Sequence, residues 1–193
     1  MDLETYLEAL ASDAPTPGGG SAATIVAALA ASLVAMVARI TRKNLSYAAK
    51  AAAADEVIAC ADALRAELIA ARTEDEEAYA RVVSAQALPK ATPAEKAERG
   101  AALQEALAGA AGAPLRAAEL ALRALRLSVE AAELGNAHLA SDVACAAIFA
   151  RAALAASAAN VRVNHAYLRD PALVSAQETT LRALETEALA VPA

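Results

Sequence analysis

Large aromatic side chains are almost absent from this 193-residue chain, which has no tryptophan and one phenylalanine. Hydrophobic residues nevertheless make up 58% of the sequence, and most of them are alanine, leucine or valine. Such small side chains bury little area each, so the fold needs close helix packing along long interfaces. The length suffices for a packed core, and we expect one domain over residues 1–193.

Cysteine, histidine and basic charge are also scarce. Cys60 and Cys145 lie far from each other and from His138 and His165, which excludes a disulfide framework and any zinc-binding spacing. We therefore expect no metal and a reducing, cytoplasmic location. The net charge of −6 argues against a nucleic-acid partner, which would require a basic stripe.

Long uncharged runs raise the question of a membrane span, above all residues 22–38. Alanine contributes little transfer free energy, and Thr24 and Ser32 reduce it further. We therefore expect a helix buried by other helices and no membrane partner. The acidic start Met1-Asp2-Leu3-Glu4 shows no secretory signal.

Strong helix formers predominate, and β-branched residues never alternate, which predicts an all-α fold. Short connections favour an up-and-down helical bundle of about six to seven helices. The helix predicted at residues 47–87 has an alternative, in which it is broken near Thr73. The predicted helices cover residues 2–12, 21–43, 47–87, 94–110, 114–134, 138–168 and 172–190.

Prolines and glycines mark the expected helix ends. Thr92 is placed to cap a helix whose first residue is Pro93, and Gly135 is placed just after a helix end. Gly109, Gly112 and Pro114 predict a break between two helices. If the chain reverses at every loop, Asp75 and Asp142 lie at the same end of the bundle as the glycines at positions 18–20.

The sequence Pro15-Thr16-Pro17-Gly18-Gly19-Gly20-Ser21 is the most specific local pattern. Three glycines before a helix permit close backbone approach, and the free N–H groups of a helix start favour anions. The alternative is a tight turn with Ser21 as the helix cap. The spacing fits neither of the nucleotide-binding glycine motifs.

Two carboxylates stand out as candidates for acid/base chemistry. Asp75 and Tyr79 share a helix face at i and i+4, although the same pattern suits a solvated acidic turn. Asp142 opens an alanine-rich segment in which Arg151 is the only other charge before residue 160, so it is either functional or a helix cap.

Amides and one lysine complete the candidates for binding. Asn160 and Asn164 continue a polar stripe from Ser157 that needs either backbone partners or a heterocyclic ligand. Lys43 ends an apolar helix, where a cation also opposes the helix dipole. Asp142 and Asn160 share a face but lie about 27 Å apart along the helix.

Several short motifs, in this order and spacing, give the chain a resemblance to the cyclodeaminase/cyclohydrolase family. This family comprises the C-terminal domain of formimidoyltransferase-cyclodeaminase and stand-alone methenyltetrahydrofolate cyclohydrolases. The chain differs from relatives at Arg42-Lys43, where a glycine with a basic residue is common, and at His138, where several have Asn. The motifs are the glycine sequence above, Asp75 with Ala78-Tyr79, Leu88-Pro89-Lys90, Thr92-Pro93 with Glu95-Lys96, Ala102-Leu103-Gln104-Glu105-Ala106, Pro114-Leu115, Gly135-Asn136, Ser141-Asp142, Asn160-Val161 with Asn164, and Leu168 with Asp170.

The resemblance implies a helical bundle that forms a homodimer and acts on a folate, with no metal and no cofactor beyond the tetrahydrofolate substrate. The implied reaction is hydrolysis of 5,10-methenyltetrahydrofolate to 10-formyltetrahydrofolate. Asp142 or Asp75 is then the base and Tyr79 a proton donor or relay. The substrate-binding candidates are Gly18, Gly19, Gly20, Ser21, Lys43, Asn136, Asn160 and Asn164. The alternatives are formiminotetrahydrofolate cyclodeaminase and a non-catalytic folate-binding helical dimer.

Overall fold

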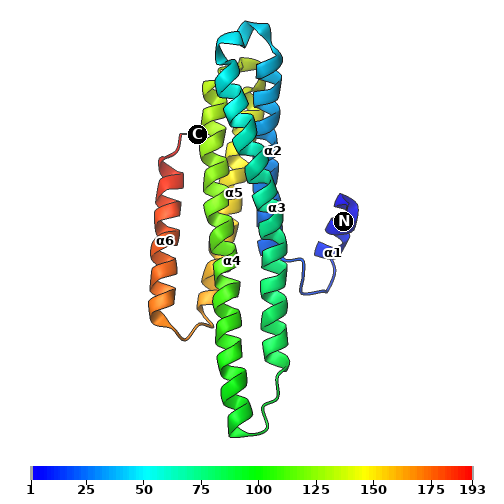
Figure 1. Cartoon of the computed structure of the whole chain (residues 1–193), viewed down its shortest axis with the longest axis vertical. Helices are drawn as coiled ribbons and strands as arrows, with labels where there is room; N and C mark the ends of the chain where they lie inside the picture. Colours follow the sequence, from blue (N-terminus) through cyan, green and yellow to red (C-terminus); the bar gives the residue numbers. More distant parts are fainter. Residues whose placement is uncertain (1, 193) are drawn as a thin grey trace.

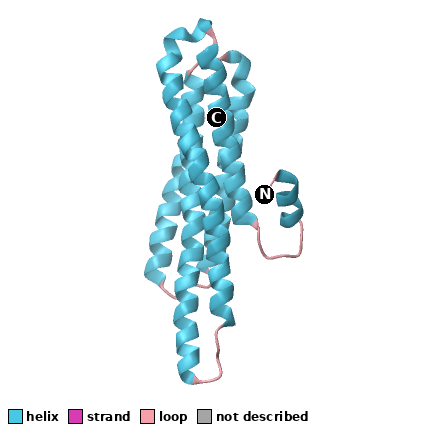
Figure 2. Cartoon of the chain, turned by 45° about the vertical axis from the view of Figure 1, so that its right-hand side comes forward, coloured by secondary structure: helices cyan, strands magenta, loops and turns pink. Residues whose placement is uncertain are grey.

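The computed structural model describes residues 2–192, and helices account for all of their regular structure (Figure 2). The prediction of an all-α fold is confirmed. The α-helices are α1 (Leu3–Leu10), α2 (Gly19–Lys43), α3 (Ala51–Ala87), α4 (Pro93–Glu133), α5 (Ala140–His165) and α6 (Pro171–Ala190), with two 3-10 segments, η1 (Leu45–Lys50) and η2 (Ala137–Leu139).

Helices α2, α3, α4 and α5 form an up-and-down four-helix bundle (Figure 1). Alanine fills much of the core, and larger side chains such as Leu64, Leu68 and Leu125 are fully buried between the helices. Helix α6 packs against α4 and α5, and α1 lies beside the start of α2. At the bottom of Figure 1, α3 and α4 extend past the other helices as a hairpin.

Helix α4 corrects the predicted break at residues 109–114, because it runs without interruption through Gly109, Gly112 and Pro114. Proline has no N–H group, so Pro114 leaves the carbonyl of Ala110 without its helical donor. The side-chain amide of Asn164 on α5 supplies that donor, with Nδ2 2.7 Å from the Ala110 oxygen. The alternative of a break near Thr73 is also wrong, since α3 is continuous.

The direction of α5 is therefore opposite to the predicted one, because a continuous α4 removes one chain reversal. Asn136, just before α5, donates to the Thr41 hydroxyl near the end of α2. Asn160, near the end of α5, lies against Gly19 at the start of α2. The prediction that placed Asp142 at the glycine end was wrong, as was the placement of Asn160 at the opposite end.

The cap positions mostly agree with the sequence. Thr92 and Glu95 form a reciprocal capping box, and Asp170 accepts hydrogen bonds at the start of α6. Gly135 has a φ of 77°, which favours glycine after a helix end. Ser21 is not a cap, because the cap of α2 is Gly18, which has no side chain for this role.

Two segments are long and apolar enough to cross a membrane by length and composition, Gly19–Lys43 and Ala137–His165. The most apolar 18-residue window of the first has a mean hydropathy of 2.2, and 61% of that window is buried in the bundle, which agrees with the expected core helix. The corresponding window of the second has a mean hydropathy of 1.6 and is only 28% buried. Helix α5 therefore leaves much apolar surface exposed.

Candidate active site at the start of helix α2

The first turn of α2 presents backbone N–H groups rather than side chains. The first helical hydrogen bond runs from the N–H of Ala22 to the carbonyl of Gly18, at 3.0 Å. The preceding N–H groups have no helical acceptor, and Gly18 offers no capping side chain. This end of α2 therefore favours a negatively charged or oxygen-rich group.

Asp75 of α3 places its carboxylate against this turn. A Cβ atom on Gly20 would lie 2.5 Å from both carboxylate oxygens, so only glycine leaves room for Asp75 here. Burial, the first cause, and the negative charge of Glu76 raise the pKa of Asp75 above its ordinary value, while the Ser21 backbone N–H lowers it. A carboxylate with a raised pKa is a more effective general base near neutral pH.

The Ser21 hydroxyl is fully buried and is engaged by protein groups on two sides. It lies 3.0 Å from the Tyr6 hydroxyl and donates to Glu76 Oε1 at 3.0 Å. Arg72 contacts the same carboxylate oxygen at 3.3 Å. Tyr6, Arg72 and Glu76 were not predicted from the sequence, although the i, i+4 spacing of Arg72 and Glu76 is a visible signal.

Two amides from the end of α5 form the opposite side of the site. Asn160 lies 3.4 Å from the position that a Cβ of Gly19 would take, and its Nδ2 donates to the carbonyl of Ala156. Both N–H groups of the Asn164 amide are used, by the carbonyls of Ala110 and Asn160. The Asn164 side chain therefore has only its oxygen left to accept a hydrogen bond from a ligand.

The structure thus brings together Gly18, Gly19, Gly20, Ser21, Asp75, Asn160 and Asn164 at one end of the bundle. Tyr79 lies one turn after Asp75 on α3 and is 42% exposed. The arrangement combines one carboxylate, free backbone donors and amide acceptors. It is suited to binding a flat polar heterocycle and to moving one proton.

Three predicted site residues lie at the other end of α2, about 36 Å away along the helix. Lys43 is exposed at the last turn of α2, and Asp142 is in the first turn of α5. Asn136 is 8% exposed and is bonded to Thr41. A single substrate held by Asp75 does not reach these residues within one chain.

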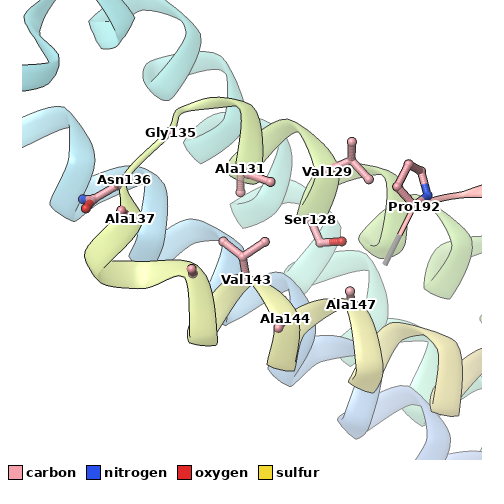
Figure 3. A pocket seen from close by; sticks show the side chains of 12 residues that line it. Ser128, Val129, Ala131, Gly135, Asn136, Ala137, Val143, Ala144, Ala147 and Pro192 are labelled. Carbon is pink, nitrogen blue, oxygen red and sulfur yellow. The ribbon is translucent and has the colours of Figure 1, made fainter.

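A cavity of about 360 Å³ lies between α4 and α5 at this opposite end of α2, and Asn136 is one of its lining residues (Figure 3). The cavity was not predicted from the sequence. In the close-up the Asn136 side chain points away from the cavity, toward α2. The Ser128 hydroxyl is bonded to the carbonyl of Leu125. The other residues that line the cavity are apolar or glycine, namely Val129, Ala131, Ala132, Gly135, Ala137, Ala140, Val143, Ala144, Ala147 and Pro192.

Potential metal ligands do not cluster in the part of the chain that the structure describes. No group of three or more His, Cys, Asp or Glu side chains there is arranged to hold a metal ion. Cys60 and Cys145 are free and exposed thiols.

Comparison with known proteins matches nearly the whole chain. Residues 2–183 match the family model described as formiminotransferase-cyclodeaminase. The chain is 39% identical to a methenyltetrahydrofolate cyclohydrolase of Methylorubrum extorquens over 96% of this chain and 89% of that protein. It is 31% identical to the formimidoyltransferase-cyclodeaminase of Sus scrofa, over 96% of this chain and 34% of the relative, so it spans about a third of that protein.

A solved structure shares the complete bundle. The crystal structure of formiminotetrahydrofolate cyclodeaminase from Thermotoga maritima matches with a TM-score of 0.80 and 26% identity. The match covers 99% of this chain and 95% of that chain.

Proposed function

Because this chain belongs to the formiminotransferase-cyclodeaminase family, we propose that it is a methenyltetrahydrofolate cyclohydrolase whose active site lies at the start of helix α2. The carboxylate of Asp75, packed against Gly20, is the observation that carries this proposal. The 39% identity to a methenyltetrahydrofolate cyclohydrolase over nearly the whole chain supports this substrate.

The reaction demands one well-placed base. The carbon that bridges N5 and N10 in 5,10-methenyltetrahydrofolate is part of a cationic amidine and is already electrophilic. Water forms a bond to this carbon while Asp75 takes one water proton. The C–N5 bond then breaks, the remaining hydroxyl becomes the formyl oxygen as its proton leaves, and N5 takes up a proton. The net change consumes one water and releases one proton.

The remaining residues of the site bind and orient the substrate in this proposal. We assign the amide oxygens of Asn160 and Asn164 as acceptors for the pterin N–H groups, and N–H groups of the α2 turn as donors to a pterin oxygen. The proximity of Asn160 to Gly19 supports this assignment. Tyr79 can relay a proton to the leaving nitrogen. A negative carboxylate beside the cationic substrate is also favourable.

Cyclodeamination of 5-formiminotetrahydrofolate is the second candidate, favoured by the similarity to the Thermotoga maritima cyclodeaminase. In that reaction N10 attacks the formimino carbon and ammonia leaves. Both reactions pass through a tetrahedral carbon and need similar proton transfers, so one site suits either. Folate binding without turnover is the third candidate.

An absorbance assay on both folates separates these candidates. Loss of the methenyl absorbance above the uncatalysed rate supports the cyclohydrolase, and its appearance from 5-formiminotetrahydrofolate supports the cyclodeaminase. Calorimetric binding without turnover would support the non-catalytic dimer. Adding a chelator is expected to leave the rate unchanged, since we propose that no metal takes part.

The variant Asp75→Asn tests the proposed base. A general base typically accelerates a reaction by about 10²- to 10⁴-fold, so we expect kcat to decrease by a factor in this range. The folded protein raises the pKa of Asp75 from 3.8, so its stabilising contribution is present below that pH and is lost as pH rises through the raised value. The variant should therefore be at least as stable as the wild type at pH 7. Unchanged turnover would contradict the role of Asp75.

We also propose that two copies associate through the side of the bundle formed by α2 and α5. Leu29 and Ile40 on α2 are 50% and 45% exposed, and Ile148 and Val163 on α5 are each 62% exposed. The exposed stripe of α5 is uncharged over its length and consists of Ser141, Cys145, Ile148, Ala152, Ala155, Ala159 and Val163. Such a surface favours burial against another protein.

A homodimer also bears on the residues at the far end of α2. If a two-fold axis runs perpendicular to the helices, each glycine end lies beside the opposite end of the second copy. Asn136, Asp142 or Lys43 of one copy can then approach the substrate of the other. The free thiols Cys60 and Cys145 support a reducing compartment, and we propose a cytoplasmic location.

A further inference from the structure

Glu76 is a second carboxylate beside the proposed base, and the reaction as described does not use it. Its Oε1 accepts a hydrogen bond from the Ser21 hydroxyl at 3.0 Å and contacts Arg72 at 3.3 Å. Neighbouring residues on a helix point about 100° apart, so Glu76 does not share the face of Asp75. Its effect on Asp75 therefore acts through charge and through the contacts that it holds.

Tyr6 closes these contacts into a ring. It is the only buried residue that α1 contributes within the described part of the chain, and its hydroxyl lies 3.0 Å from the Ser21 hydroxyl. The guanidinium carbon of Arg72 lies 5.9 Å from the centre of the Tyr6 ring, within the range of a cation–π contact. Tyr6, Ser21, Glu76 and Arg72 thus connect α1, α2 and α3 next to the glycine turn.

We propose that Glu76 is a charge-tuning and positioning residue for Asp75, and that Tyr6, Ser21 and Arg72 hold it in this role. The inference rests on the proposed role of Asp75 as the base. A second negative charge nearby disfavours the ionised form of Asp75, and Arg72 partly offsets that charge. This agrees with the raised pKa of Asp75, to which burial contributes first and Glu76 second.

Other charged groups on the helices around Asp75 are paired with other residues or exposed. The phenol of Tyr79 lies one turn after Asp75 on α3. Helix α2 carries no charge before Arg39, and Tyr6 of α1 is the phenol in the ring. On α3, Glu74 pairs with Arg116 of α4 at 3.5 Å. Glu77 on α3 is exposed, and on α5 Arg162 bonds to Glu178 and Glu185, and His165 to Gln177, all three on α6.

The experiment compares two variants that change the charge in opposite directions. Glu76→Gln removes the negative charge and keeps an oxygen that can accept from Ser21. Arg72→Gln removes the offsetting cation. Asp75 must be ionised to accept a proton, so the acid limb of the kcat/KM pH profile should move to lower pH in Glu76→Gln and to higher pH in Arg72→Gln. Glu77→Gln is the matched control and should leave the profile unchanged.

A structural role alone would reduce activity in both variants without opposite shifts. The carboxyl carbon NMR titration of Asp75 should show the same opposite shifts, whether or not the protein turns over a folate. In a Tyr6→Phe background the shift caused by Glu76→Gln should be smaller, because Ser21 and Glu76 are held less firmly.

The two proposals fail in different ways. In the first case Asp75→Asn is inactive, and the titration midpoint of Asp75 is unchanged, or moves in the same direction, in Glu76→Gln and Arg72→Gln. The inference about Glu76 is then wrong and the proposed function stands. If Asp75→Asn keeps full turnover while the titration midpoints move in opposite directions, Glu76 tunes Asp75 but Asp75 is not the base.

Discussion

Gly20 is the residue on which the candidate site depends most directly. A side chain there would meet the Asp75 carboxylate at 2.5 Å, whereas a Cβ on Gly19 would meet the Asn160 amide at 3.4 Å, a tight but tolerable contact. The two positions are adjacent in the first turn of α2, so alanine changes helix propensity similarly at both. They differ mainly in the neighbour that must move.

Gly20→Ala should therefore lower kcat by up to about 10²-fold, because it displaces the proposed base from the glycine turn. Gly19→Ala should stay within a few-fold of the wild type. Both should fold with similar thermal stability, since alanine gains about 0.5 to 1 kcal/mol over glycine in a helix. Steady-state kinetics and thermal unfolding of the pair check this. Equal activity losses would show that Asp75 does not need its observed position.

At the level of elements, the contact between α4 and α5 decides how the bundle is built. Pro114 does not end α4, because the Asn164 amide replaces the missing N–H donor for the Ala110 carbonyl. The same amide also donates to the Asn160 carbonyl one turn earlier on α5, and the Asn160 side chain lies against Gly19. The Asn164 side chain thus joins α4 and α5 at the end of the bundle that holds the site.

A double-mutant cycle tests this exchange of donors. Asn164→Ala leaves the Ala110 carbonyl without a partner and should cost about 1 to 3 kcal/mol in the free energy of unfolding. Pro114→Ala restores the helical N–H, so Asn164→Ala should cost less in that background. Denaturant unfolding of the four proteins measures the coupling. Additive costs would mean that Asn164 does not substitute for the missing donor.

At the level of the whole molecule, the exposed apolar side chains of α2 and α5 govern the expected assembly. Ile148→Glu would place a charge in the proposed interface, where its burial without a partner is costly. Light scattering after size-exclusion chromatography should show half the mass of the wild-type dimer. Ile69→Glu on α3, which is 50% exposed in the chain, is the control and should remain dimeric. A monomeric wild type would contradict the dimer.

The sequence by itself determined the helical class, most helix ends and the family, because these depend on local properties. Propensity, the Thr92 capping box and the Gly135 turn act within a few residues along the chain. The position of Asp75 at the same end of the bundle as the glycine turn was also predicted correctly from helix length and chain reversal. Motif order and spacing sufficed for the resemblance to a folate enzyme family.

Only the tertiary structure decided which end of the bundle Asp142, Asn160 and Asn164 occupy. The sequence predicted a break before Pro114, because local rules do not supply a donor for the Ala110 carbonyl. The additional chain reversal then placed Asp142 at the glycine end of the bundle and Asn160 at the opposite end, whereas the structure has them the other way round. The ring that includes Tyr6 and Glu76 was likewise invisible, because it joins side chains of α1, α2 and α3. Long-range hydrogen bonds are formed only after the helices pack, which is why the sequence did not reveal them.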